Sequence, residues 1–188
     1  MDALLTALLG CFLAEIGDKN QLLVLALATR FRQEGAIIAG IALAAAANAA
    51  IAAVAGAFLS PMLGSDARLL FLALAVLFLG IGLLWRVKSP DPLADWPTGP
   101  FLTAALGLFI LGLGNSSQFL ILVIAVRTAE PVLAGIGGML GVTAALVPVV
   151  LLRERILHAG AVRATRLMVA MLMLIIALIL IVTALQLV

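Results

Sequence analysis

The sequence predicts an all-α integral membrane protein with six transmembrane helices arranged as two inverted three-helix repeats. Hydrophobic residues make up 65% of the 188-residue chain and charged residues 11%, with a mean hydropathy of +1.32, whereas soluble domains carry about 25% charged residues. Apolar stretches long enough to cross a bilayer recur along the chain. The first and fourth of these stretches also resemble each other in sequence.

The six predicted helices alternate with short connections that hold helix breakers or charges. We expect the helices at residues 2–29, 35–59, 67–86, 100–127, 131–152 and 163–187. The longest connection contains three prolines and two aspartates and divides the chain. This gives a first repeat at 1–87, an inter-repeat loop at 88–99 and a second repeat at 100–188, all within one membrane domain.

The basic residues predict the orientation. If both termini lie outside, the outer connections hold only Arg68 and Arg127. The inner side then holds Arg30, Arg32, Arg86, Lys88, Arg153, Arg155, Arg163 and Arg166. Because Lys and Arg are enriched on the cytoplasmic side, we expect a multi-pass protein of the cell inner membrane with both termini periplasmic.

The two halves are related by an offset of 97 positions. Residues 5–30 and 102–127 are identical at 12 of 26 positions, including two glycine pairs, a glutamine pair and an arginine pair. Each half has three predicted spans, an odd number, so the second half enters the membrane inverted. Inverted repeats with polar interruptions near the middle of the membrane are typical of secondary transporters.

Small residues recur every fourth position in the second predicted helix, including Gly40, Ala44 and Gly56. Gly137, Gly141 and Ala145 continue the pattern in the other half. Such a stripe is typical of close helix packing. Asn48 is the polar side chain within this stripe, and both interhelical hydrogen bonding and ligand contact are open for it.

The first polar cluster reads Glu-Ile-Gly-Asp-Lys-Asn-Gln at residues 15–21, in the middle of an apolar stretch. Each charge there costs roughly 2.5–3.5 kcal/mol on insertion scales. A continuous helix would put Glu15 and Asp18 on one face, with Gln21 one turn further. Their oxygens suit Mn²⁺, Ca²⁺ or Mg²⁺. An ion pair between Glu15 and Lys19 is the alternative, and Lys19 could also balance charge when the site holds no cation.

The second polar cluster occupies the related place in the other half. It reads Gly-Leu-Gly-Asn-Ser-Ser-Gln at residues 112–118 and carries no charge. Asn115, Ser116 and Gln118 are its predicted cation ligands, with Ser117 as a further neutral oxygen. Polar contacts that merely hold helices together are the alternative. We expect the two clusters to meet at the midplane.

The first cluster resembles the E-x-G-D-K-[TS]-Q signature of a family of Golgi and bacterial cation–proton exchangers. This is family sixteen of the uncharacterised protein families, also called GDT-one, and the resemblance covers the whole chain. It implies export of Mn²⁺, or exchange of Ca²⁺ and Mn²⁺ against protons, with Glu15 and Asp18 as ligands and proton carriers. Asn20 stands where the family has Thr or Ser, and the second motif lacks both acids and the basic residue.

We therefore expect a secondary transporter that exports a divalent cation, Mn²⁺ before Ca²⁺, in exchange for protons. Carboxyl groups away from water take up protons, and metal binding requires their release. The alternatives are a transporter of another small cation or polar solute, and a degenerate member with a structural or interaction role. No enzyme, resident cofactor or nucleic-acid partner is expected; membrane lipid surrounds the chain, and a homodimer is one oligomeric state that the sequence allows.

Overall fold

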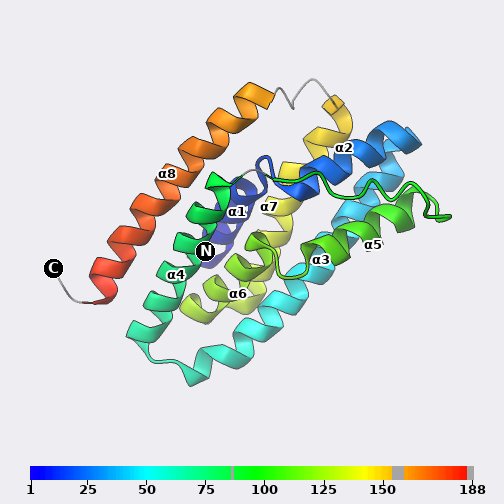
Figure 1. Ribbon diagram of the computed structural model, residues 1–188. Coiled ribbons are helices and arrows are strands. Elements are labelled where there is room, and N and C mark those ends of the chain that lie inside the picture. Colours follow the sequence, from blue (N-terminus) through cyan, green and yellow to red (C-terminus); the bar gives the residue numbers. More distant parts are fainter. Residues whose placement is uncertain (86, 154–158, 186–188) are drawn as a thin grey trace.

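The chain folds into packed helices joined by turns and one long loop (Figure 1). A computed structural model describes residues 1–85, 87–153 and 159–185, so Arg86 and Arg155 of the predicted inner side lie outside the described residues. The elements are α1 (Asp2–Glu15), α2 (Lys19–Phe31), α3 (Glu34–Leu59), η1 (Ser60–Met62), α4 (Ser65–Leu84), α5 (Pro100–Gly112), α6 (Ser116–Thr128), α7 (Pro131–Leu152) and α8 (Ala159–Ala184).

The helices of the described ranges provide four or five candidate membrane spans. Four helical stretches are long and apolar enough to cross a bilayer, namely Glu34–Met62, Ser65–Leu84, Pro131–Leu152 and Gly160–Ala184. The pair α5 and α6 makes a fifth if it counts as one span, although it is bent by 64°. An all-helical, multi-pass fold is therefore confirmed, while the sixth span remains a prediction.

Two of the predicted continuous helices are broken. The stretch predicted at 2–29 forms α1 and α2, of 14 and 13 residues, and the stretch predicted at 100–127 forms α5 and α6, of 13 residues each. Each piece is shorter than the roughly 20 residues that a bilayer requires. Both breaks fall at the polar clusters.

The helices pack in an order that brings the two breaks together. In the middle of the bundle, α1 lies against α6 and α7, while α3 lies against α5, α6 and α7. The pair α4 and α8 stands side by side at the left of Figure 1. Ala-rich and Leu-rich clusters of buried side chains fill the space between these helices.

Glycines allow the closest of these contacts. A Cβ atom on Gly40 of α3 would lie 2.8 Å from the Phe101 carbonyl oxygen of α5. A Cβ atom on Gly137 of α7 would likewise run into the Leu4 carbonyl group of α1. Close backbone approach therefore occurs along the small-residue stripe.

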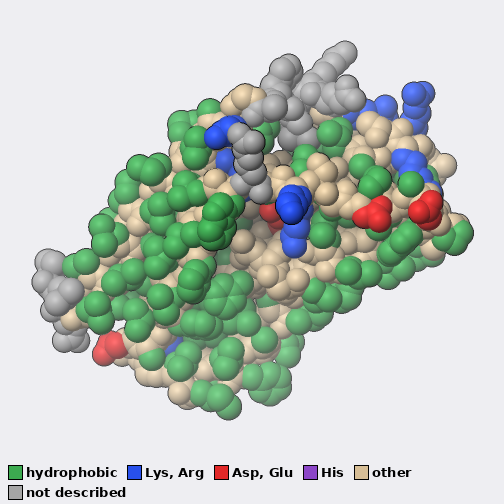
Figure 2. Space-filling model, in the orientation of Figure 1, with side chains coloured by type: hydrophobic (Ala, Val, Ile, Leu, Met, Phe, Trp, Pro, Cys, Tyr) green, Lys and Arg blue, Asp and Glu red, His purple; other side chains and the backbone are tan. Residues whose placement is uncertain are grey.

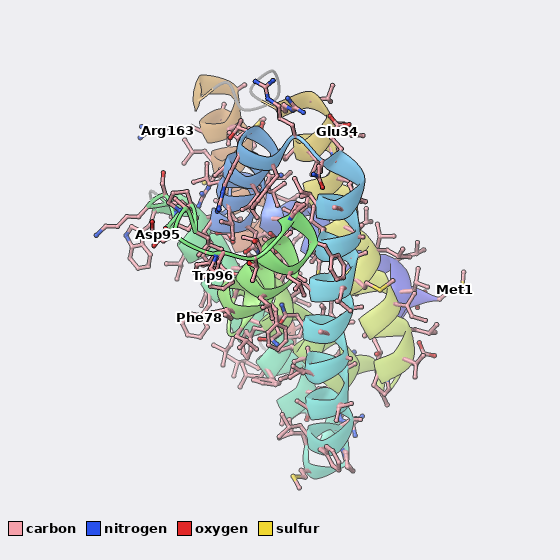
Figure 3. All side chains as sticks on the ribbon, turned by 90° about the vertical axis from the view of Figure 1, so that its right-hand side faces the viewer. Met1, Glu34, Phe78, Asp95, Trp96 and Arg163 are labelled. Atoms are coloured by element: carbon pink, nitrogen blue, oxygen red, sulfur yellow. The ribbon has the colours of Figure 1, made fainter. Side chains whose placement is uncertain are left out.

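Several charged side chains gather at one end of the molecule. Figure 2 shows blue and red side chains at its upper right, whereas the opposite side is largely hydrophobic. Arg153 at the end of α7 pairs with Glu34 at the start of α3, with 3.1 Å between Nη2 and Oε1. Glu34 and Arg163 both lie at the upper end in Figure 3. Arg30 holds the inter-repeat loop through hydrogen bonds to the Leu93 and Trp96 carbonyl groups.

Candidate cation site

The two helix breaks have nearly the same backbone geometry. The φ and ψ angles are −62° and 115° at Ile16 and −62° and 120° at Leu113. The next residues are Gly17 and Gly114, with φ of +66° and +71°. Left-handed angles suit glycine because it has no Cβ atom. The chain therefore turns out of one helix and starts another at matching places in the two halves.

A glutamine closes each break. The Gly17 N–H donates to Gln21 Oε1 at 2.8 Å, and the Gly114 N–H donates to Gln118 Oε1 at 2.6 Å. A buried backbone N–H without a partner is costly. The two glutamines thus satisfy donors that the interrupted helices leave free.

The same glutamines tie the breaks to neighbouring helices. Gln21 Nε2 donates to the Ala145 carbonyl oxygen of α7 at 3.0 Å. Gln118 Nε2 lies 3.4 Å from the Asn48 carbonyl oxygen of α3. Residues 48 and 145 are themselves 97 positions apart, so both halves use the same type of anchor.

Glu15, at the end of α1, is the buried carboxylate between the two breaks. It is 1% exposed. Its carboxylate accepts hydrogen bonds from Ser117 Oγ at 2.7 Å, Asn20 Nδ2 at 2.9 Å and Asn115 Nδ2 at 3.3 Å. All three donors are neutral, so a charged Glu15 keeps its charge unless a proton or cation joins it.

A small cavity of about 30 Å³ lies beside Glu15. This is enough room for a particle of the size of a water molecule or a bare metal ion. Its polar lining residues are Glu15, Asn20, Asn48, Asn115, Ser117 and Gln118. Carboxylate, amide and hydroxyl oxygens are the ligands that hard divalent cations prefer.

The structure brings only some of the predicted ligands to this cavity. Four of them line it, namely Glu15, Asn48, Asn115 and Gln118. Three do not, namely Asp18, Gln21 and Ser116. Gln21 instead lines a separate cavity of about 230 Å³ between α2, α7 and α8, and Ser116 is exposed.

The helix break explains why Asp18 separates from Glu15. Our expectation that both acids share one helix face required a continuous helix, but α1 ends at Glu15 and α2 begins after Asp18. Asp18 and Lys19 are both half-buried. Within the described residues, no ion pair joins Lys19 to Glu15.

Sequence reasoning did not select two residues that contact Glu15. Asn20 enters the sequence analysis only as a departure from the family signature, and Ser117 only as a further neutral oxygen beside the predicted ligand Ser116. Positions 20 and 117 are 97 residues apart, and both donate to Glu15. Applying the repeat offset to residues around Glu15 would have paired them.

Arg166 makes a further contact with the first break. The orientation predicted from the sequence counts this residue on the inner side, and in the structure it is a buried residue of α8. Its guanidinium donates to the Gly17 carbonyl oxygen at 2.5 Å and to the Trp85 carbonyl oxygen at 3.2 Å. It therefore clamps the first break to the ends of α4 and α8.

Comparison with known proteins identifies the family. Residues 3–91 match the family model described as "Divalent cation/proton antiporter GDT1". The chain is also 33% identical, over 153 residues, to a Vibrio cholerae protein named "Putative manganese exporter", covering 81% of this chain and 76% of the relative. The chain belongs to the GDT1 family of divalent cation/proton antiporters.

Membership in the GDT1 family confirms several expectations from the sequence. The protein is a multi-pass membrane transporter, not an enzyme, and its transported substrates are a divalent cation and protons. The oxygen-lined cavity beside Glu15 suits such a cation chemically. No solved structure matches this chain.

Proposed function

We propose that this GDT1 protein exports Mn²⁺ in exchange for protons, with the ion held beside Glu15 between α1 and α6. The observation that carries the proposal is a fully buried carboxylate that faces a cavity lined with amide and hydroxyl oxygens. The name of the Vibrio cholerae relative favours Mn²⁺ over Ca²⁺. Ca²⁺ prefers six to eight ligands in a roomier site, so the small volume favours the same choice.

Proton coupling follows from the surroundings of Glu15. A buried carboxylate without a cation partner is expensive, so the side chain binds a proton when the ion leaves. The metal binds only the deprotonated form, so the ion and the proton exclude each other. Because one group cannot hold both at once, their movements across the membrane are coupled in opposite directions.

The matching breaks support an inverted-repeat transporter. The paired backbone angles, the two glutamine anchors and the glycine contacts at positions 40 and 137 all recur at the offset of 97. One cavity is lined by Gln21 and Ala145, and the Glu15 cavity is lined by their counterparts at the offset of 97, Gln118 and Asn48. These two cavities are candidates for the access routes from opposite sides, opened in turn as the halves rock.

Asp18 is proposed as a second proton-coupling residue. It is half-buried and lies at the start of α2, immediately after the left-handed Gly17. It does not line the Glu15 cavity. We therefore assign it to proton transfer along the first break, and assign ion binding to Glu15.

A transport assay with two variants separates these roles. Everted vesicles, whose cytoplasmic face is outside, should accumulate Mn²⁺ when their interior is acidic. Glu15→Gln should abolish both Mn²⁺ binding and accumulation because it removes the charged ligand. Asp18→Asn should abolish accumulation but leave binding within a few-fold of the parent. Unchanged accumulation in Glu15→Gln would refute the site.

A second candidate function is transport of a monovalent cation. The cavity has one carboxylate, Glu15, among otherwise neutral polar side chains. A divalent ion there leaves one uncompensated charge, whereas a monovalent ion is balanced. Competition decides between them: Na⁺ or K⁺ at low millimolar concentration should displace bound Mn²⁺ only if the second candidate is correct.

A further inference from the structure

Asn20 carries a buried oxygen that the surrounding protein leaves without a partner. The side chain is 4% exposed and lines the cavity beside Glu15. Within the described residues, its Oδ1 is buried and has no hydrogen-bond partner. Buried polar atoms are almost always paired in folded proteins, so an unpaired amide oxygen at a cation cavity calls for an explanation.

The nitrogen of the same amide donates hydrogen bonds to the Glu15 carboxylate. Asn20 Nδ2 lies 2.9 Å from Oε2 and 3.2 Å from Oε1, so it donates toward both carboxylate oxygens. A cation bound in bidentate fashion by Glu15 would have to take this place. The amide N–H groups thus partly substitute for a positive charge while Glu15 holds neither an ion nor a proton.

We propose that Asn20 is a switchable cation ligand, which holds Glu15 through its nitrogen without the ion and ligates the ion through its oxygen. Turning the amide by half a rotation about its last side-chain bond exchanges Nδ2 and Oδ1. The oxygen would repel the charged carboxylate unless a cation lies between them, so at a pH where Glu15 is deprotonated the turn and ion binding favour each other. This inference rests on the proposed ion site at Glu15.

Ser117 gives this switch a counterpart in the second half. It stands 97 positions after Asn20, and its hydroxyl donates to Glu15 Oε1 at 2.7 Å. A hydroxyl can donate or accept by rotating its hydrogen, so it can also change from donor to ligand. Asn20 and Ser117 therefore flank the carboxylate as two neutral groups that can both reverse polarity.

Two substitutions at Asn20 distinguish a ligand from a residue that only positions Glu15. Mn²⁺ binding is measured by isothermal titration calorimetry on the detergent-purified full chain at pH 8. Asn20→Asp supplies a second negative oxygen, so it should tighten Mn²⁺ binding about ten-fold or more, and Asn20→Leu should weaken it about ten-fold or more. Asn20→Asp should also slow Mn²⁺ release in the vesicle assay.

A purely positioning role gives a different pattern. Both variants remove the amide donor to Glu15, so both would then weaken binding, and that result would overturn the switch while leaving the Glu15 site intact. Loss of binding in Glu15→Gln tests the underlying site independently, and retained binding there would defeat both proposals. If Asn20→Leu fails to fold, the direction of the Asn20→Asp effect decides alone. Thr183→Val is the control, because among the described residues this hydroxyl bonds only the Ile179 carbonyl group of its own helix.

Discussion

At the scale of single residues, two features that lower the stability of the folded protein lie side by side at the Glu15 cavity. Glu15 is buried among neutral donors, and Asn20 keeps an unpaired oxygen next to it. Each feature alone disfavours folding. A cation bound at the proposed site would lower both costs, so we expect the stability of the protein to depend on its substrate.

Gly17 and Gly114 offer a matched test of the two breaks. Both have left-handed φ angles, so alanine at either position should cost about 1 kcal/mol or more of stability. Gly114 has open space around it, whereas a Cβ atom on Gly17 would lie 2.6 Å from Arg166 Cδ and 2.7 Å from Val162 Cγ1. Arg166 is pinned by two hydrogen bonds and cannot easily move.

Gly17→Ala should therefore destabilise the protein by about 1–3 kcal/mol more than Gly114→Ala, since overpacking adds to the backbone cost. Thermal unfolding in detergent measures the difference. Equal losses in the two variants would mean that the Arg166 clamp does not hold the first break.

At the scale of elements, Gly40 allows α3 and α5 to pack closely. Gly40→Ala would place a Cβ atom against both the Ala104 side chain and the Phe101 carbonyl group, so α3 and α5 would have to move apart. We expect a loss of about 1–3 kcal/mol from this overpacking. Gly82→Ala, in the open on α4, is the control and should be neutral or stabilising by up to about 1 kcal/mol. Similar unfolding temperatures for both variants would contradict the packing described above.

Apolar length predicted the uninterrupted helices well. The helix expected at 131–152 matches α7, and the one expected at 35–59 differs from α3 by one residue. The helices expected at 67–86 and 163–187 begin two and four residues after the starts of α4 and α8. The breaks in the first and fourth predicted helices were not predicted, because hydropathy shows how long an apolar stretch is and not whether its backbone turns. Gly17 and Gly114 were visible in the sequence, but their left-handed angles depend on the tertiary anchors of the two glutamines.

The second helix break, between α5 and α6, limits which site residues the sequence can predict. Glu15, Asn115 and Gln118 were selected for their chemistry and do line the cavity. Chemistry alone does not separate Ser116 from Ser117, because both offer the same hydroxyl oxygen. Asn115 instead caps a new helix, as its Oδ1 accepts the Gln118 N–H at 2.9 Å. That restart turns Ser117 toward Glu15 and leaves Ser116 exposed.

At the scale of the whole molecule, the predicted orientation can be tested with introduced cysteines. The native Cys11 is buried and should stay silent. Asp66→Cys lies at the start of α4 on the predicted outer side, and Asp91→Cys lies in the inter-repeat loop on the predicted inner side; both positions are exposed. A membrane-impermeant maleimide added to intact spheroplasts should label the first variant only. Labelling of the second variant alone would show that the orientation is opposite to the predicted one.

The two helix breaks have similar backbone angles but differ in charge. The first half supplies Glu15 and Asp18, whereas the second supplies neutral groups at the corresponding positions. The proposed ion site is therefore symmetric in backbone and asymmetric in charge. We expect this asymmetry to limit the number of protons exchanged for each ion, because only the first half can titrate at the breaks.

Anomalous X-ray scattering from crystals grown with Mn²⁺ tests the ion site most directly. The proposal predicts one strong peak within coordination distance of the Glu15 carboxylate, in the cavity that Asn115 and Ser117 line, with the Asn20 amide oxygen turned toward it. A peak at Asp18 instead, or fully occupied Mn²⁺ sites with nothing beside Glu15, would contradict it.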